Sequence, residues 1–200
     1  VCVVGMEFLV FVRRTKILLS LLALHNGEDT RNINFNLETA DSLTTDWKKI
    51  FKTAKEGFDV VIGNPPYVKF QDLNTKLREK LYTEWETLKT GNYNLYFAFF
   101  ELGISILKKN GLLGYITPNN YFTSLAGMKL RDYLGSKTLI KKIVDFNHLK
   151  IFNAQTYTAI TFLTKTKKDF FYYERVEENE TLKKLSSLKF SKISFKDLNN

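Results

Sequence analysis

An apolar run that passes directly into two prolines is the feature that most limits what this sequence can fold into. Residues 58–63, Phe-Asp-Val-Val-Ile-Gly, have the length and composition of a buried β-strand. They are followed at once by Asn64, Pro65, Pro66 and Tyr67. Each proline fixes its own φ and holds the preceding residue in an extended conformation. We therefore predict a buried strand that ends in a stiff, polar and aromatic loop.

The loop residues combine hydrogen-bond acceptors with an aromatic face. The Asn64 carboxamide supplies an oxygen, and the Pro65 carbonyl has few local competitors because prolines lack an N–H. Tyr67 adds a ring on which a planar ligand can stack. A planar group that carries an exocyclic NH2, such as adenine, matches this set. A plain Asn-Pro turn after a strand is the structural alternative.

Apolar strands and helical segments alternate along the chain, which is typical of a parallel-type α/β sheet with helices on both faces. Ligands of such sheets bind at the carboxyl ends of the strands. That edge should collect Glu7, Asp41 and the loop at 64–67, because each follows an expected strand. After about Lys165 the pattern dissolves into a charged tail. Strands are expected at 1–7, 32–37, 58–63, 112–117, 139–146 and 156–164, and helices at 8–24, 74–89, 92–109 (stopped by Asn110-Gly111) and 126–136.

Composition narrows the partners and the compartment. Thirty Lys and Arg residues against 21 Asp and Glu residues give a net charge of +9, which favours a polyanionic partner. A single cysteine, Cys2, excludes an internal disulfide and fits a reducing, cytoplasmic setting. With His25 and His148 as the two histidines, no metal site is expected. The apolar run at 17–24 is too short to cross a bilayer, and we interpret it as one face of a core helix.

Three blocks occur in an order that is specific to one enzyme family: FDVVIGNPPY at 58–67, YNLYFAFFE with LKKNGLLGYITPNNYFTS at 93–124, and VDFNHLKIFNAQTYTAI at 144–160. On these blocks the chain resembles, over about residues 1–165, the adenine-specific (amino-group) DNA methyltransferases of the gamma type. These enzymes act in restriction–modification systems, and some fuse methylation with cleavage. The tetrapeptide alone is also shared with methylases of release-factor glutamine and of guanine in ribosomal RNA.

The resemblance implies a Rossmann-like, S-adenosylmethionine-dependent methyltransferase sheet that acts on a flipped adenine of double-stranded DNA. Asn64 and Pro65 would hold the target amino group, and Pro66 completes the catalytic tetrapeptide. Tyr67 would stack on the flipped base. Phe152 matches a second aromatic that the family packs on that base, with core packing as the alternative.

The resemblance also implies a set of residues that bind S-adenosylmethionine. Glu7 falls where the family places an acid on the ribose hydroxyls, and Asp41 matches the acid on the cofactor's adenine amino group. Phe8 and Phe99 match the apolar plates on either side of that adenine, although core packing is the alternative for Phe99. Asn94 opens the stretch that lies near the cofactor.

The family's glycine-rich first motif, a strand leading through an acidic residue into Gly-x-Gly, has no counterpart here. We therefore expect the sheet to lack its first, central strand, which leaves two strand edges without a neighbour. On this interpretation residues 1–165 form a partial catalytic domain. Residues 166–200 form a charged extension that leads toward an absent target-recognition region. A missing N-terminal segment or subunit would then complete the sheet.

The predicted activity is site-specific methylation of the adenine amino group in DNA, with S-adenosylmethionine as the methyl donor. Two alternatives stay open. One is the methylation of RNA or of a protein glutamine. The other is a degenerate, non-catalytic remnant that binds DNA through its charge.

Overall fold

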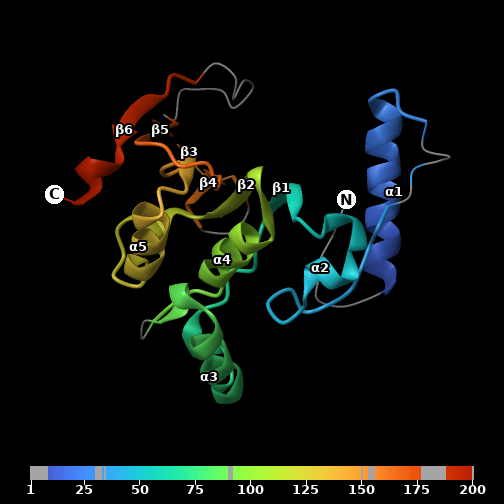
Figure 1. Ribbon diagram of the computed structural model, residues 1–200, viewed down its shortest axis with the longest axis horizontal. Coiled ribbons are helices and arrows are strands. Elements are labelled where there is room, and N and C mark those ends of the chain that lie inside the picture. Colours follow the sequence, from blue (N-terminus) through green and yellow to red (C-terminus); the bar gives the residue numbers. More distant parts are fainter. Residues whose placement is uncertain are drawn as a thin grey trace. The chain divides into compact units, whose positions relative to one another are not determined.

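The chain forms two compact units, Val1–Ile50 and Phe51–Asn200, which are described separately (Figure 1). The computed structural model describes residues 9–29, 33, 35–89, 92–149, 151–152, 156–176 and 188–199, and for residues 9–14 only the backbone. The strand predicted at 1–7, together with Glu7 and Phe8, lies outside the described residues.

The first unit contains α1 (Leu9–His25) and the short α2 (Trp47–Ile50). Helix α1 confirms the helix predicted for residues 8–24. Residues 33 and 35–37 do not form a strand, so the strand predicted at 32–37 is wrong for the residues described. Alternating polar and apolar side chains stabilise a strand only where a neighbouring strand and a core are available to them.

The apolar side chains of α1 are exposed within this unit, which contradicts the prediction of a core helix. Ile17, Leu18 and Leu22 are 59%, 65% and 58% exposed. A unit that contains one long helix and one single-turn helix has too little chain to cover both sides of the long one. None of the described helices has the length and apolar character needed to cross a membrane.

The second unit is a six-stranded sheet in the order β1-β2-β4-β3-β5-β6. β1 and β2 are parallel and so are β3 and β5, whereas β4 and β6 run antiparallel to their neighbours. The prediction of a parallel-type sheet is therefore correct for the pairs β1–β2 and β3–β5 only. The sheet is mixed because the chain returns from β3 directly into the antiparallel strand β4. The strands are β1 (Phe58–Gly63), β2 (Leu107–Pro118), β3 (Ile140–Asp145), β4 (Thr158–Leu163), β5 (Phe170–Arg175) and β6 (Ser191–Ser194).

Helices α4 (Tyr96–Ile106) and α5 (Met128–Ser136) cover one face of this sheet (Figure 1). On the opposite face, Val144, Phe146 and Val176 pack against side chains that lie outside regular secondary structure: Leu149, Ile151, Leu188 and Phe190. Helices on both faces were predicted, and this is wrong for the described part of the unit. Helix α3 (Thr75–Glu84) begins where the Asn74 side chain accepts a hydrogen bond from the Leu77 N–H at 2.9 Å.

Helix α4 ends earlier than predicted, and Asn110-Gly111 lies inside β2 instead of stopping a helix. The register of β1 and β2 is irregular here, where β2 passes close to Phe58. A Cβ on Gly111 would lie 2.9 Å from the Phe58 carbonyl oxygen and 2.7 Å from the Leu107 side chain. The glycine therefore permits a close approach of two strands.

β1 confirms the predicted strand but not its burial. Within the described residues it pairs only with β2, so it forms one edge of the sheet. Val60 and Ile62 are 59% and 78% exposed. The sequence predicts that a central strand next to β1 is absent, and an open edge at β1 agrees with that prediction. At the other end of the sheet, β5 and β6 were not predicted, because their sequences lie in the charged segment after Lys165.

Candidate active site

The carboxyl ends of β1, β2 and β3 share one edge of the sheet, because these strands point in the same direction. The tetrapeptide Asn64–Tyr67 follows β1, Asn119 follows β2, and Asp145 ends β3. This is the edge at which the sequence placed the ligand site. We refer to it as the catalytic edge.

The residues of the tetrapeptide differ in their exposure. Asn64 and Pro66 are exposed, Pro65 is buried, and Tyr67 is half-buried. The Tyr67 hydroxyl donates to Asn64 Oδ1 at 2.5 Å and lies 3.3 Å from the Ile116 carbonyl oxygen. No described residue donates a hydrogen bond to the Pro65 carbonyl. Both predicted acceptors are therefore at the catalytic edge, one of them held by Tyr67.

The Tyr67 ring rests edge-on against Tyr96, with ring centroids 6.1 Å apart and planes at 75°. Tyr96 is fully buried, and its hydroxyl donates to Asn120 Oδ1 at 2.9 Å. Burial raises the pKa of Tyr67 above the ordinary value for tyrosine. The buried ring of Tyr96 therefore supports the ring of Tyr67 from behind. Tyr96 and Asn120 were not predicted as site residues.

The residues after the tetrapeptide are fixed to the segment that leads into α4. The Leu95 N–H donates to the Val68 carbonyl at 2.8 Å, and the Phe70 N–H donates to the Tyr93 carbonyl at 2.9 Å. Asn94 lies between these two bonds, and its buried Oδ1 has no partner among the described residues. A buried acceptor of this kind is costly unless a donor reaches it. A donor on a bound ligand would satisfy it, and the cofactor-binding role of Asn94 stays a prediction.

The other predicted ligand residues are accessible to different degrees. Phe99 is partly exposed, although its neighbours Phe97 and Phe100 on α4 are fully buried. Phe152 is 39% exposed on the connection from β3 to β4. Asp41 belongs to the first unit, where its carboxylate accepts from the Leu43 N–H at 3.0 Å.

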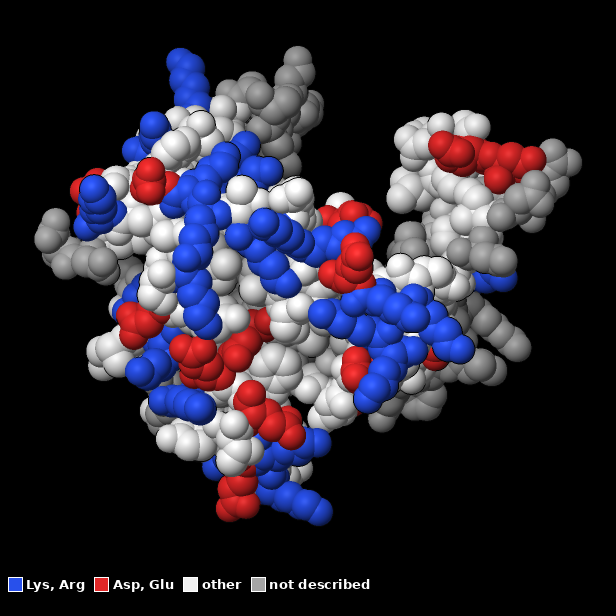
Figure 2. Space-filling model, in the orientation of Figure 1, with Lys and Arg blue, Asp and Glu red and all other residues white. Residues whose placement is uncertain are grey.

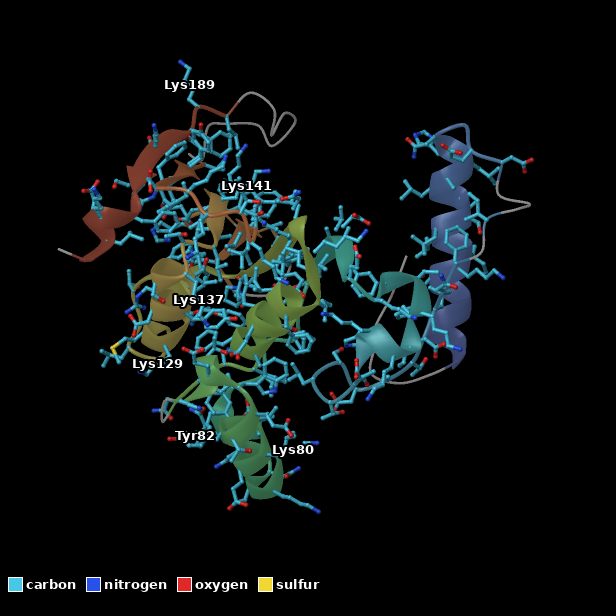
Figure 3. The ribbon with its side chains drawn as sticks, in the orientation of Figure 1. Lys80, Tyr82, Lys129, Lys137, Lys141 and Lys189 are labelled. Carbon is cyan, nitrogen blue, oxygen red and sulfur yellow. The ribbon has the colours of Figure 1, made fainter. Side chains whose placement is uncertain are left out.

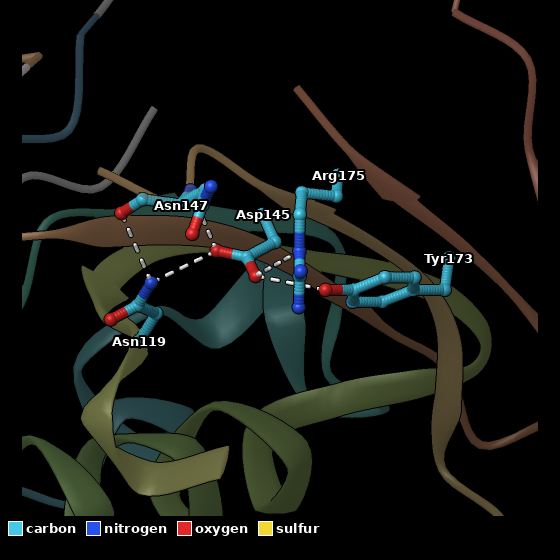
Figure 4. Close-up of polar contacts among 5 residues, drawn as sticks. All are labelled: Asn119, Asp145, Asn147, Tyr173 and Arg175. Carbon is cyan, nitrogen blue, oxygen red and sulfur yellow. Dashed lines mark hydrogen bonds and ion pairs between the residues drawn. The ribbon is translucent and has the colours of Figure 1, made fainter. Parts of the chain in front are cut away.

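The catalytic edge also holds a buried carboxylate that the sequence did not indicate. Asp145 accepts hydrogen bonds from residues on neighbouring strand ends, which Figure 4 shows. The sequence signal was slight: Pro118 closes a strand and is followed by two asparagines. Residues far apart in the chain make these contacts, so spacing alone did not reveal them.

On the face seen in Figure 2, Lys and Arg side chains are scattered among Asp and Glu side chains. Lys137 and Lys141, labelled in Figure 3, lie near the start of β3, at the opposite end from Asp145. Part of this charge is used within the fold. Lys137 pairs with Glu86 at 3.1 Å and lies 3.7 Å from the centre of the Tyr133 ring. The positive charge therefore supports a polyanionic partner without marking one surface for it.

Solved methyltransferases share the fold of this sheet, which has the loop at its carboxyl edge, so the predicted Rossmann-like methyltransferase fold is confirmed. The chain belongs to the Eco57I restriction-modification methylase family, whose model matches residues 9–152. The prediction of a restriction–modification methyltransferase family is thereby confirmed.

Individual proteins that are similar in sequence are also restriction–modification enzymes. The chain is 36% identical over 124 residues to the type II restriction enzyme and methyltransferase RM.Eco57I of Escherichia coli, and covers 12% of it with 60% of its own length. It is 33% identical over 145 residues to the type II methyltransferase M.BanIII of Aneurinibacillus aneurinilyticus. The aligned region covers 69% of this chain and 25% of M.BanIII. The chain thus spans a quarter or less of the length of these relatives.

Solved structures show the same fold at low identity. The type I restriction-modification methyltransferase subunit of Streptococcus thermophilus superimposes with a TM-score of 0.62 at 19% identity, over 88% of this chain and 42% of that one. The type IIL restriction-modification enzyme MmeI, solved in complex with DNA, gives a TM-score of 0.60 at 14% identity, over 86% of this chain and 24% of that one.

Proposed function

We propose that the chain provides the catalytic edge of a DNA methyltransferase that modifies the amino group of adenine within a restriction–modification system. The observation that carries this proposal is the position of two acceptors, Asn64 Oδ1 and the Pro65 carbonyl, directly after β1 and beside the supported ring of Tyr67. The relatives named as type II methyltransferases and the solved complex of MmeI with DNA support DNA as the acceptor.

In this proposal, two hydrogen bonds from the target amino group into Asn64 and Pro65 orient it and draw its nitrogen toward a pyramidal geometry. The lone pair, otherwise delocalised into the ring, becomes available for attack. S-adenosylmethionine, when bound, would supply a methyl group from its positively charged sulfur, which would leave as a neutral thioether, and the methylated nitrogen would then lose one proton to water. Both acceptors are uncharged, so they act by alignment rather than as strong bases.

The remaining assignments concern stacking and cofactor binding. Tyr67 stacks on the flipped base, worth about 1–3 kcal/mol, which offsets part of its removal from the duplex. Phe152 is the second stacking residue. Asn94 and Phe99 bind the cofactor, together with Asp41 and with Glu7 and Phe8. Localisation in the cytoplasm follows from DNA as the substrate.

The test replaces Asn64 by Ala in the complete enzyme that contains this chain. We expect the unsubstituted enzyme, with S-adenosylmethionine and unmethylated bacterial DNA, to produce N6-methyladenine that is measured by mass spectrometry of digested nucleosides. Asn64→Ala should abolish this product, since one of the two acceptors is lost. Asn110→Ala, an exposed position near the start of β2, is the matched control and should methylate normally.

Each other outcome contradicts a defined part of the proposal. Methyl transfer to RNA or to a protein glutamine instead of DNA would overturn the substrate. Salt-dependent DNA binding without affinity for S-adenosylmethionine would identify a non-catalytic binder. An active Asn64→Ala chain would remove the assigned role of the tetrapeptide.

A further inference from the structure

Asp145 is a buried carboxylate at which three strands of the sheet meet. It is 4% exposed and ends β3. Its Oδ1 accepts from Asn119 Nδ2 and from the Asn147 N–H, both at 2.9 Å, and its Oδ2 accepts from the Tyr173 hydroxyl at 2.8 Å. Arg175 Nε lies 3.9 Å from Oδ2. We call these five residues the Asp145 cluster (Figure 4).

The composition of the cluster shows that it depends on a carboxylate at this position. Asn119, Asn147 and Tyr173 all turn hydrogens toward the same two oxygens, and the nearest cation is the long Arg175 contact. Removing the acceptor would leave three donors facing one another in a buried site, which is strongly unfavourable. An amide of the same size would bring two further hydrogens toward them.

One branch of the cluster leads to the proposed catalytic tyrosine. Asn119 and Asn120 begin the turn after β2, and Asp145 fixes the first of them. The side chain of the second accepts from the hydroxyl of Tyr96 at 2.9 Å. The ring of Tyr96 in turn supports Tyr67. A displacement of the turn at Asn119 would therefore be passed to Tyr67 through one hydrogen bond and one ring contact.

The other branch holds the two ends of the connection between β3 and β4, on which Phe152 lies. At its start, the Asn147 N–H is bound to Asp145. At its end, the Tyr157 carbonyl accepts from the Asn119 N–H at 3.0 Å. Asn119 Nδ2 also lies 3.5 Å from the Asn147 carbonyl oxygen. The start of the connection is thus attached to the side chains of Asp145 and Asn119, and its end is attached to the backbone of Asn119.

We propose that Asp145 is a positioning residue that sets the separation of Tyr67 and Phe152 and so shapes the clamp for the extruded base. This rests on the proposed function, because it assigns those two aromatic residues to the base. Asp145 itself touches neither base nor cofactor. β5, through Tyr173 and Arg175, holds the carboxylate in place.

Three variants of the full chain separate positioning from stability. Asp145→Asn keeps the volume and removes the acceptor pattern. The double variant Asn119→Asp with Asp145→Asn exchanges donor and acceptor and restores one hydrogen bond between the two positions. Ile143→Val, at a buried position on the same strand, removes one methyl group from the core, should lower the midpoint of urea unfolding, and leaves the cluster untouched.

Methylation kinetics and amide hydrogen exchange are measured on all of them, well below their melting temperatures. Misplacing the clamp should lower kcat of Asp145→Asn by about 100-fold, with KM for S-adenosylmethionine unchanged. Exchange should quicken in residues 119–122 and 146–149 but not in α5. The double variant should recover part of both, and Ile143→Val should change neither.

Different outcomes would contradict the proposed function and the positioning role of Asp145. If the unsubstituted chain does not methylate DNA, the proposed function fails, while hydrogen exchange still decides whether Asp145 anchors the two segments. Normal kcat in Asp145→Asn, or faster exchange spread evenly over the sheet, would overturn the positioning role. A loss of activity that Ile143→Val shares would assign Asp145 to stability alone.

Discussion

At the scale of single residues, the contact between Tyr67 and Asn64 places two proposed functions in competition. The Tyr67 hydroxyl occupies the amide oxygen that the target amino group would need. The base would either use the second lone pair of this oxygen or displace the hydroxyl, for which the Ile116 carbonyl oxygen at 3.3 Å offers another acceptor. The ring can remain in contact with Tyr96 during that exchange, because rotation of the hydroxyl leaves the ring in place.

This separates the contributions of the ring and the hydroxyl of Tyr67. We expect Tyr67→Phe to retain most of the methylation activity, since the ring is kept and the Asn64 oxygen is freed. Tyr67→Ala should lower kcat/KM by about 5- to 150-fold, the equivalent of about 1–3 kcal/mol of stacking. N6-methyladenine formation measures both. A Phe variant as weak as the Ala variant would show that the hydroxyl, not the ring, is essential.

At the scale of elements, the start of β1 depends on a glycine. Gly57 has a φ of +109°, and a Cβ there would lie 2.5 Å from the Ile106 carbonyl oxygen. The strand that delivers the tetrapeptide therefore begins where the backbone passes the end of α4 too closely for any side chain.

Two glycine substitutions should consequently have opposite effects on stability. Gly57→Ala should destabilise the fold by on the order of 1–3 kcal/mol or more, because it combines an unfavourable φ with a backbone clash. Gly135→Ala, in α5 with open space around it, should stabilise by about 0.5–1 kcal/mol. Urea unfolding measures both. Equal effects at the two positions would contradict this assignment.

Elements with strong local signals were predictable from the sequence, and those specified by distant neighbours were not. β1 with its prolines, α3 with its Asn74 cap, and α5 each carry their own pattern. β5 reads as a charged aromatic segment, and its strand conformation comes from pairing with β3. The tetrapeptide was predictable because its chemistry is contiguous, whereas the Asp145 cluster is assembled from three strand ends.

At the scale of the whole molecule, the sheet buries several phenols against α4 and α5. Burial raises the pKa of Tyr96, Tyr115 and Tyr121 well above 10, and burial with the nearby carboxylates of Glu101 and Glu86 raises the pKa of Tyr133 to about 12. Above pH 10 the unfolded chain loses these protons while the folded chain keeps them, which favours unfolding.

Stability from these groups should therefore be constant below pH 10 and fall as the pH rises from 10 toward their folded pKa values. Urea unfolding at pH 8, 9, 10 and 11, at constant ionic strength, measures the decline. Tyr115→Phe should make the decline shallower, because it removes one of the protons involved. An unchanged slope in this variant would show that Tyr115 takes no part.

The pairing of β5 with β3 limits how this chain can be recombined with others. A junction placed at Lys165 would separate Tyr173 and Arg175 from Asp145, and a foreign strand would have to supply equivalent donors. The Val176 N–H, bound to the Asp145 carbonyl at 2.8 Å, is the last described contact of this stretch with that residue. Chimeras that exchange the C-terminal part should therefore be joined beyond Val176, so that the native strand travels with the catalytic half.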